Sequence, residues 1–172
     1  MKRTLWLAAL GLAAVAPAVQ QDTFGYPSNL SLRLGWVYPI DSVTRDNSRS
    51  LIGVGAEYFL DRSLLADGET TISFDWLGKS GSGAKGNLFP IMLNQRFYTS
   101  EGTGYGTERT YWYVGAGVTF IDVTNSDTVL TIGTGIGKEF GQNIFGELRF
   151  LYSDSAGGAR ATSIGAYVGY RF

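Results

Sequence analysis

The chain has 172 residues, a formal net charge of −1, and neither histidine nor cysteine. It can therefore form no Ser-His or Cys-His nucleophile, no disulfide, and none of the usual zinc or haem ligand sets. The near-neutral charge gives no electrostatic basis for nucleic-acid binding. The chain is instead rich in glycine (24 residues) and in aromatic residues (10 Phe, 10 Tyr and 4 Trp), which indicates a single domain of many strands and tight turns.

The first 18 residues have the layout of a secretory signal peptide. Two basic residues at positions 2–3 precede an apolar stretch at 5–14, and an Ala-Pro-Ala sequence at 16–18 places small residues at the −3 and −1 positions of a cleavage site. The apolar stretch is too short for a membrane-spanning helix, which needs about 20 residues. We therefore expect residues 1–18 to be a signal peptide and residues 19–172 to form the exported domain.

In the exported part, apolar and polar residues alternate with a period of two in eight segments, which is typical of strands with one apolar face. In the first segment, Leu32 and Leu34 share one face while Arg33 and Gly35 lie on the other. At roughly 9 to 12 residues, most segments have the length that a tilted strand needs to cross a bilayer. In chain order the segments are residues 30–38, 52–60, 70–76, 89–97, 112–120, 130–140, 144–152 and 163–172.

The connections between these segments are short and rich in Gly, Ser, Asn or Asp, as turn chemistry requires. The predicted turns are residues 39–48, 61–68, 79–86, 99–109, 122–127, 141–143 and 154–160. The predicted fold class is therefore an all-β, eight-stranded, antiparallel up-and-down transmembrane β-barrel.

Charge helps to decide which face of the strands points inward, since a soluble barrel of the lipocalin type places its apolar faces inside. The polar faces carry four Arg and four carboxylates, alternating with Gly, Ser and Thr, and almost no Lys. Such a balanced set is typical of a narrow interior in which charges satisfy one another. The predicted lumen charge network consists of Arg33, Glu57, Asp75, Arg96, Glu139, Glu147, Arg149 and Arg171.

The aromatic residues of the apolar faces also favour lipid outside. If the strands run alternately up and down, six aromatic residues fall near each rim, and two such girdles are typical of membrane interfaces. Near the rim that holds the chain termini lie Tyr58, Phe97, Trp112, Phe140, Tyr170 and Phe172, and near the other rim lie Trp36, Tyr38, Trp76, Phe89, Phe120 and Tyr152. Three residues interrupt the apolar face: Gln95, Thr134 and Lys138.

The last segment ends the chain in Phe172, with apolar or aromatic residues at alternate positions before it. In this ending and in its architecture the chain resembles the small eight-stranded outer-membrane barrels of Gram-negative envelopes, the group of the outer-membrane protein A transmembrane domain, OmpX, OmpW and the opacity proteins. The resemblance implies that Val168, Tyr170 and Phe172 form the signal read by the barrel-assembly machinery. The whole exported chain shares the architecture of this group, but only the last strand shares a sequence motif with it.

The same resemblance implies the location and the partners. We expect a monomer in the outer membrane of a Gram-negative-type envelope, exported by a cleaved signal peptide. Its expected partners are outer-membrane lipid and lipopolysaccharide, together with the barrel-assembly machinery and periplasmic chaperones during biogenesis; no nucleic-acid partner is expected.

Three motifs that suggest other chemistry are weak. Residues 133–138 alternate glycine as GxGxG, and Glu139 stands where a phosphate-binding loop needs Ser or Thr. Asp122, Asn125 and Asp127 offer oxygen ligands for a hard cation, but a polar hairpin turn explains them as well. The strand carboxylates have Arg partners available, so ion pairing is favoured over acid–base work. We expect no cofactor, no metal and no catalysis.

Alternatives stay open on the enzyme question, on the lumen and on the membrane location. Barrel enzymes resemble one another in an active-site His, which this chain lacks, but acyltransferase-like chemistry without His remains open. The favoured function is a non-enzymatic structural or surface-interaction role with a plugged lumen. A narrow, glycine-lined channel for small or amphipathic solutes is the alternative, and a soluble ligand-binding barrel is the third hypothesis.

Overall fold

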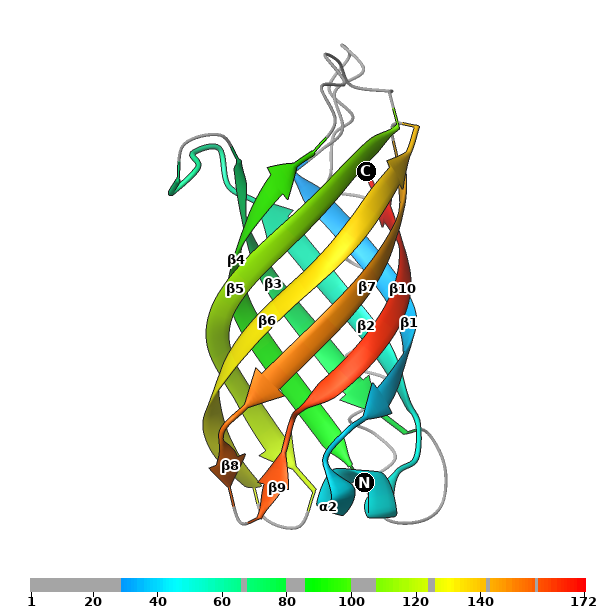
Figure 1. Ribbon diagram of the computed structural model, residues 1–172, viewed down its shortest axis with the longest axis vertical. Helices are drawn as coiled ribbons and strands as arrows, with labels where there is room; N and C mark the ends of the chain where they lie inside the picture. The colour runs from blue at the N-terminus through cyan, green and yellow to red at the C-terminus, as the bar shows by residue number, and fades with distance from the viewer. Residues whose placement is uncertain are drawn as a thin grey trace.

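The computed structural model describes residues 29–65, 68–79, 86–99, 108–123, 126–141, 143–156 and 158–172, so the predicted signal peptide lies outside the described residues. Within these ranges, long antiparallel strands close into one barrel in the order β1-β10-β7-β6-β5-β4-β3-β2 (Figure 1). The eight-stranded transmembrane barrel fold predicted from the sequence is confirmed. The barrel strands are β1 Leu30–Pro39, β2 Leu51–Phe59, β3 Glu69–Gly78, β4 Asn87–Tyr98, β5 Arg109–Asp122, β6 Ser126–Phe140, β7 Ile144–Ser153 and β10 Ser163–Arg171.

Pairing between the first and last strands closes the barrel. Leu34 of β1 lies opposite Val168 of β10, and β1 also pairs with β2 from Leu30 to Val37. Closure leaves no barrel strand with an open edge, so the backbone N–H and C=O groups of the wall find partners within it. This is the condition that lets a sheet face hydrocarbon.

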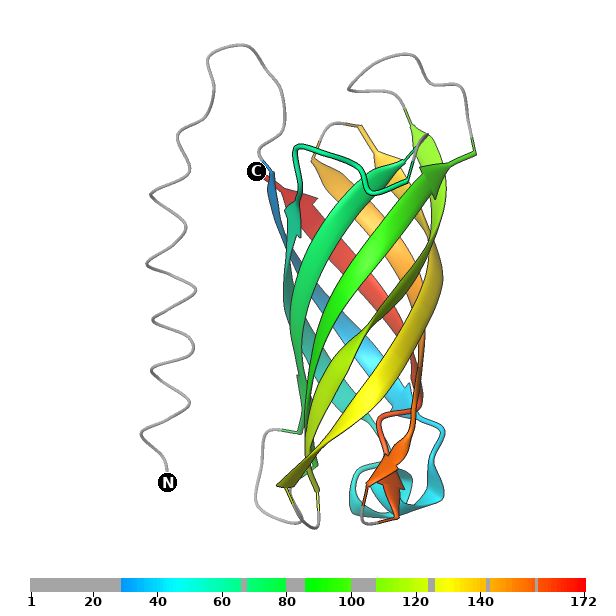
Figure 2. The same ribbon diagram turned by 90° about the vertical axis from the view of Figure 1, so that its left-hand side faces the viewer.

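The two ends of the barrel differ, and we name them by what they carry. At the terminal end lie Asn29 and the C-terminal Phe172, and at the other, the α2 end, lie the short helix α2 (Ser42–Asn47) and the hairpin of β8 (Ser155–Ala156) and β9 (Ala159–Arg160) (Figures 1 and 2). No helix among the described residues is long and apolar enough to cross a membrane.

Both α2 and the β8–β9 hairpin fall in connections for which the sequence predicted only turns. Asp41 caps α2 by accepting a hydrogen bond from the backbone N–H of Thr44 at 3.0 Å. The hydroxyl of Thr44, which is fully buried, donates to the carbonyl of Arg160 at 2.9 Å, and the N–H of Ile40 donates to the carbonyl of Thr162 at 2.9 Å. These contacts join the two elements across the α2 end, and they depend on tertiary structure that local sequence does not reveal.

The apolar faces of the strands point outward. Leu34, Ile132 and Val168 are 60 %, 59 % and 65 % exposed, although each lies in the middle of its strand. The lipocalin-type arrangement, with these faces inside, is therefore not the one adopted. A continuous exposed apolar belt of this kind is suited to lipid rather than water.

The wall has one interruption, between β3 and β4. The pairing runs to Phe74 opposite Ile91 and resumes only at Leu77 opposite Leu88. The gap faces Pro90, which has no N–H to donate to β3 and pairs instead with Thr119 of β5. The wall thus lacks backbone pairing between β3 and β4 at this point.

A charge on the outward face tests whether that face meets lipid. We expect Leu34→Arg to destabilise the barrel by about 2–4 kcal/mol in lipid vesicles, the cost of arginine near the bilayer midplane, as measured by denaturant unfolding. The control is Ser50→Arg, at an exposed position between α2 and β2, which should change stability by less than about 0.5 kcal/mol. Equal losses in the two variants would contradict a lipid-facing wall.

Candidate functional site

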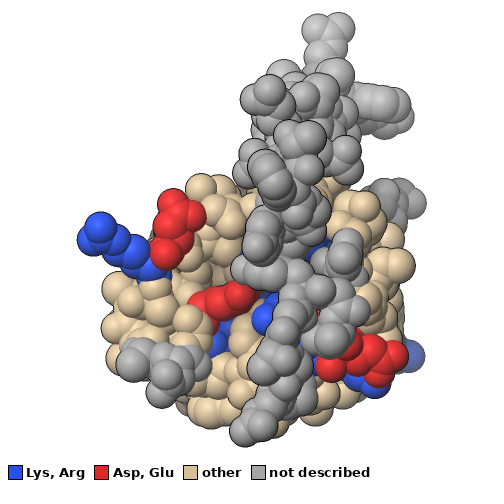
Figure 3. Space-filling model, turned by 90° about the horizontal axis from the view of Figure 1, so that it is seen from above, with Lys and Arg blue, Asp and Glu red and all other residues tan. Residues whose placement is uncertain are grey.

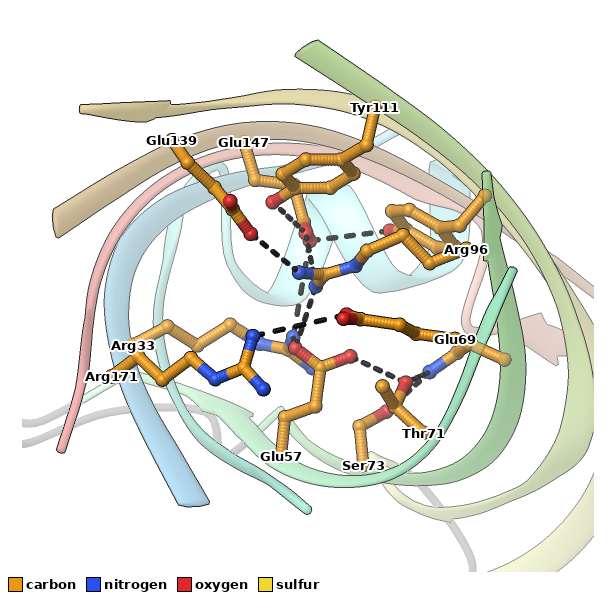
Figure 4. Close-up of polar contacts among 12 residues, drawn as sticks. Arg33, Glu57, Glu69, Thr71, Ser73, Arg96, Tyr111, Glu139, Glu147 and Arg171 are labelled. Atoms are coloured by element: carbon orange, nitrogen blue, oxygen red, sulfur yellow. Dashed lines mark hydrogen bonds and ion pairs between the residues drawn. The ribbon is translucent and has the colours of Figure 1, made fainter. Parts of the chain in front are cut away.

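The inward faces of the terminal half of the barrel bring charged side chains together. Seen from the terminal end, acidic and basic side chains lie side by side inside the ring of strands (Figure 3). The structure places all eight residues of the predicted lumen network in this one connected cluster. Figure 4 shows the part of the cluster that contains Glu57, Arg96 and Glu147.

Asp75 on β3 is the centre of the innermost group and is completely buried. Arg33 binds it through two parallel hydrogen bonds, from Nε to Oδ1 and from Nη2 to Oδ2, both at 2.8 Å. Arg149 adds a third from Nη1 at 2.6 Å, and its other nitrogens donate to the Tyr113 hydroxyl at 2.7 Å and to the Ser73 hydroxyl at 3.3 Å. One carboxylate on β3 therefore holds two guanidinium groups, from β1 and from β7, which flank β10.

Glu57 and Glu147 form the next group, around Arg96. The Arg96 Nη2 donates to Glu57 at 2.8 Å, and the Thr71 hydroxyl donates to the other oxygen of Glu57 at 2.6 Å. Glu147 accepts from the Tyr111 hydroxyl at 3.0 Å. The guanidinium of Arg96 lies 4.0 Å from the centre of the Tyr111 ring. The ring therefore covers the cation, while the hydroxyl of the same residue donates to Glu147, a counterion of Arg96.

Longer ion pairs connect these groups to each other and to the mouth. Arg33 Nη1 lies 3.6 Å from Glu57 and 3.9 Å from Glu147. Arg96 Nη1 lies 3.8 Å from Glu139, which belongs to the outermost group. The charges thus form a network rather than separate pairs.

The outermost group lies at the terminal mouth. Arg109 binds Glu139 through Nε at 2.7 Å and Nη2 at 2.6 Å. The Tyr98 hydroxyl donates to Glu69 at 2.7 Å and contacts Glu139 at 3.1 Å, and Arg171 lies 3.8 Å from Glu69. A polar recess of about 310 Å³, lined in part by Glu69 and Arg171, opens at this mouth.

Sequence reasoning missed Glu69 and Arg109, which stand at the first positions of β3 and β5. The signal was present, because Glu69 has the same parity as Asp75, and Arg109 has the same parity as Tyr113. With them the network holds five arginines and five carboxylates, so its formal charge is balanced.

The α2 half of the lumen is apolar, which corrects the expectation of a polar inner face throughout. Aliphatic side chains from the α2 ends of the strands fill it and are nearly inaccessible; Leu77 is 1 % and Leu88 is 0 % exposed. The cluster consists of Val37, Leu51, Leu77, Leu88, Met92, Ile121, Val129, Leu151, Ala159, Ala161 and Tyr167. Strand parity directs these side chains inward, and the cover formed by α2 and the β8–β9 hairpin shields such an aliphatic core from water at that end.

The inward glycines make room for inward aromatic rings. A Cβ on Gly35 would lie 2.4 Å from the Tyr167 ring, and one on Gly137 would lie 2.2 Å from the Tyr111 ring. The space beside Gly169 is likewise occupied, by the ring of Phe145. Tyr111, Tyr113 and Tyr167 all point inward and are buried, so the glycine-lined space expected for a channel is occupied.

The twelve predicted girdle aromatics all lie at outward positions and are at least partly exposed. By strand direction, the six residues assigned to the rim of the termini lie toward the terminal end, and the other six lie toward the α2 end. Phe97 and Trp112 stack at the terminal rim with ring centroids 4.5 Å apart. The C-terminal residues Tyr170 and Phe172 pack edge to face at 5.2 Å.

Each of the three polar residues that interrupt the outward face has a hydrogen-bond or ion-pair partner within the protein. The Thr134 hydroxyl donates to the carbonyl of Tyr113 at 2.8 Å. Lys138 pairs at 2.5 Å with Glu108, the residue before β5 begins. Gln95 is 7 % exposed because the segment after β2 covers it.

The other chemical motifs do not form sites among the described residues. Residues 133–138 lie within β6 rather than in a loop before a helix, which removes the context of a phosphate-binding loop. Asp122 accepts from the Ser126 hydroxyl at 3.3 Å and Asp127 accepts from the N–H of Thr128 at 2.7 Å, as in a polar turn; Asn125 lies outside the described residues. In the described part of the chain, no three His, Cys, Asp or Glu residues are grouped as metal ligands.

Comparison with known proteins adds information on the fold. Neither a protein-family profile nor a curated protein matches the chain. Among solved structures, the N-terminal β-barrel domain of Pseudomonas aeruginosa OprF matches with a TM-score of 0.59 at 18 % identity, over 85 % of this chain and 99 % of that domain. The fold is that of the small eight-stranded outer-membrane barrels.

Two further structures agree with this fold. The Yersinia pestis outer membrane protein Ail in a phospholipid nanodisc matches with a TM-score of 0.55 at 14 % identity, over 84 % of this chain and 99 % of Ail. A de novo designed transmembrane β-barrel matches with a TM-score of 0.54 at 14 % identity, over 90 % of this chain and all (100 %) of the design. Because a designed barrel shares the fold, the likeness by itself carries no particular function.

Removing one charge from the network tests its balance. We expect Asp75→Asn to cost about 3–5 kcal/mol in unfolding free energy, because it removes the charged acceptor that hydrogen-bonds both buried guanidinium groups. Among the described residues, only the longer ion pairs to Glu57 and Glu147, at 3.6–3.9 Å, then remain for Arg33 and Arg149. The double variant Asp75→Asn/Arg149→Gln removes one charge of each sign and should lose less than the sum of the two single variants. Denaturant unfolding in vesicles measures all three.

The control for this experiment is the exposed pair at the terminal rim. Lys138→Gln breaks an ion pair whose side chains are 44 % and 65 % exposed, and it should cost less than about 1 kcal/mol. An Asp75→Asn loss as small as that of Lys138→Gln would mean that the network does not depend on charge balance.

Proposed function

We propose that the protein is a non-catalytic outer-membrane barrel with a structural or surface-interaction role. The observation that carries the proposal is the filling of the lumen at two levels. A charge-balanced network occupies the terminal half, and an aliphatic cluster occupies the α2 half, with Asp75 and Leu88 both 0 % exposed. A lumen filled in this way supports a plugged barrel that works through its outer surfaces.

The proposed orientation places the terminal end in the periplasm and the α2 end outside the cell. Three features support an outer membrane of Gram-negative type: the predicted signal peptide, the two outward aromatic girdles and the match to outer-membrane barrels. The partners proposed with this location are outer-membrane lipid and lipopolysaccharide around the wall. A monomer is proposed, since one chain closes the barrel.

The α2 end supplies the proposed contact surface. Hydrogen bonds from Thr44 to Arg160 and from Ile40 to Thr162 hold α2 and the β8–β9 hairpin together. Buried Ala159 and Ala161 pack this cover onto the aliphatic cluster below it. A cover fixed in this way offers a small, pre-ordered surface, which lowers the entropy cost of binding a partner.

A catalytic role finds no support in the described residues. Every carboxylate of the network is paired with at least one arginine, and Glu57, Asp75 and Glu147 are each 4 % exposed or less. A general acid or base must reach a substrate proton within hydrogen-bonding distance. These groups are instead committed to one another.

Conductance measurements test the plugged lumen. We expect refolded protein that shows heat-dependent gel mobility, and is therefore folded as a barrel, to give no discrete conductance steps in planar lipid bilayers. The physical reason is that the aliphatic cluster excludes water and ions from the α2 half. Discrete steps from such protein would overturn the plugged lumen in favour of the narrow channel.

The last strand is proposed to carry the assembly signal of Val168, Tyr170 and Phe172. We expect Phe172→Ala to lower the amount of folded barrel in the outer membrane of cells several-fold while refolding of pure protein in detergent stays unchanged. The control is Phe140→Ala, at another outward aromatic of the terminal rim. Equal losses in cells for both variants would contradict a signal specific to the last strand.

A further inference from the structure

The segment that follows β2 lies against the outside of the barrel wall. Residues 60–65 leave the terminal mouth sideways and do not cover the lumen (Figures 1 and 2). Gln95, at an outward position of β4, donates from Nε2 to the Ser63 hydroxyl at 2.9 Å. Gly68, at the return of the segment, lies against the same side chain, since a Cβ there would lie 2.3 Å from Nε2 of Gln95. The segment is therefore seated directly on the wall.

The polar groups at this contact satisfy one another. The Thr70 hydroxyl donates to Gln95 Oε1 at 2.6 Å and accepts from the N–H of Leu64 at 2.8 Å. The Ser63 hydroxyl donates to the carbonyl of Leu65. Thr70 is 0 % and Gln95 is 7 % exposed, although both stand on the face that elsewhere carries apolar side chains. A polar pair on a lipid-facing wall is thereby removed from contact with lipid.

The same segment turns two leucines away from the barrel. Leu64 is 66 % and Leu65 is 55 % exposed, which in water would be an unfavourable arrangement for two adjacent leucines in a loop. The segment rests on the Thr70–Gln95 pair, and the next outward-facing pair along β3 and β4 is the exposed pair Ile72 and Leu93. The two leucines therefore continue the apolar belt of the wall at its terminal rim.

We propose that residues 60–65 form a lipid anchor, which inserts Leu64 and Leu65 into the membrane interface at the terminal end. This inference rests on the proposed membrane location of the barrel. Internal hydrogen bonds satisfy polar groups of the segment, and the two leucines bury apolar surface in the acyl-chain boundary. Under the proposed orientation the anchor occupies the periplasmic leaflet.

The absence of cysteine from the chain allows a direct test by single labels. Leu64→Cys and Leu65→Cys are labelled with an environment-sensitive NBD fluorophore in protein refolded into phosphatidylcholine vesicles. Arg62→Cys, an exposed position of the same segment, is the matched control, and Leu34→Cys reports the wall itself. Quenching is compared between aqueous iodide and lipids carrying a spin label high on the acyl chain.

The expected result is a blue-shifted emission at Leu64 and Leu65 relative to Arg62, with quenching by the spin-labelled lipid rather than by iodide. Leu64 and Leu65 labels that are quenched like the Arg62 label, while the Leu34 label stays in lipid, would overturn the anchor and leave the membrane location intact. A water-exposed Leu34 label would overturn the proposed location itself. Protection of the leucine labels from both quenchers would indicate a protein contact and would also overturn the anchor.

A second variant tests the seat of the segment. Gln95→Ala removes the side chain that binds both Ser63 and Thr70, so the emission of the Leu64 label should shift to the red, toward that of the Arg62 label. The Leu34 label reports that the barrel remains folded. An unchanged Leu64 emission would overturn the role of the wall contact in holding the anchor.

Discussion

Closure of eight strands sets the interior width on which the rest of the structure depends. An eight-stranded barrel is only wide enough for side chains to fill, and a large side chain on one strand needs a small one facing it. The rings of Tyr167 and Tyr111 occupy the space left at Gly35 and Gly137, so these glycines and inward rings form one packing arrangement. A composition rich in both residue types follows from this constraint on the inside, together with the aromatic rims on the outside.

In the same narrow interior, each charge of the network needs partners within the barrel. Charged groups removed from water lose their hydration, and the loss is offset only where each has opposite charges and hydrogen bonds around it. Asp75 meets this condition with three hydrogen bonds from two arginines, and Glu57 meets it with Arg96 and Thr71. The network and the aliphatic cluster then divide the lumen between them, one filling it with paired polar groups and the other with hydrocarbon.

One rule about polar groups applies to the outer wall as well. Lipid offers no hydrogen bonds, so a polar side chain there must find its partner within the protein. Thr134 uses a backbone carbonyl of the neighbouring strand, Lys138 reaches Glu108 beyond the strand end, and Gln95 is covered by the segment after β2. The polar residues of the apolar face thus show how that face is completed.

The sequence by itself determined the eight strands, the inward charges and the outward aromatic residues, because a period of two assigns each side chain to a face without knowledge of its neighbours. It did not determine which charges meet: Arg33 and Asp75 are 42 residues apart, and Arg149 and Asp75 are 74 apart, so strand order and register decide their contact. Nor did it predict α2 and the β8–β9 hairpin, since each is too short to be stable alone and is held by the contact of Thr44 with Arg160. The aliphatic half of the lumen depends on that cover, because only a closed end lets inward leucines such as Leu77 and Leu88 stay out of water.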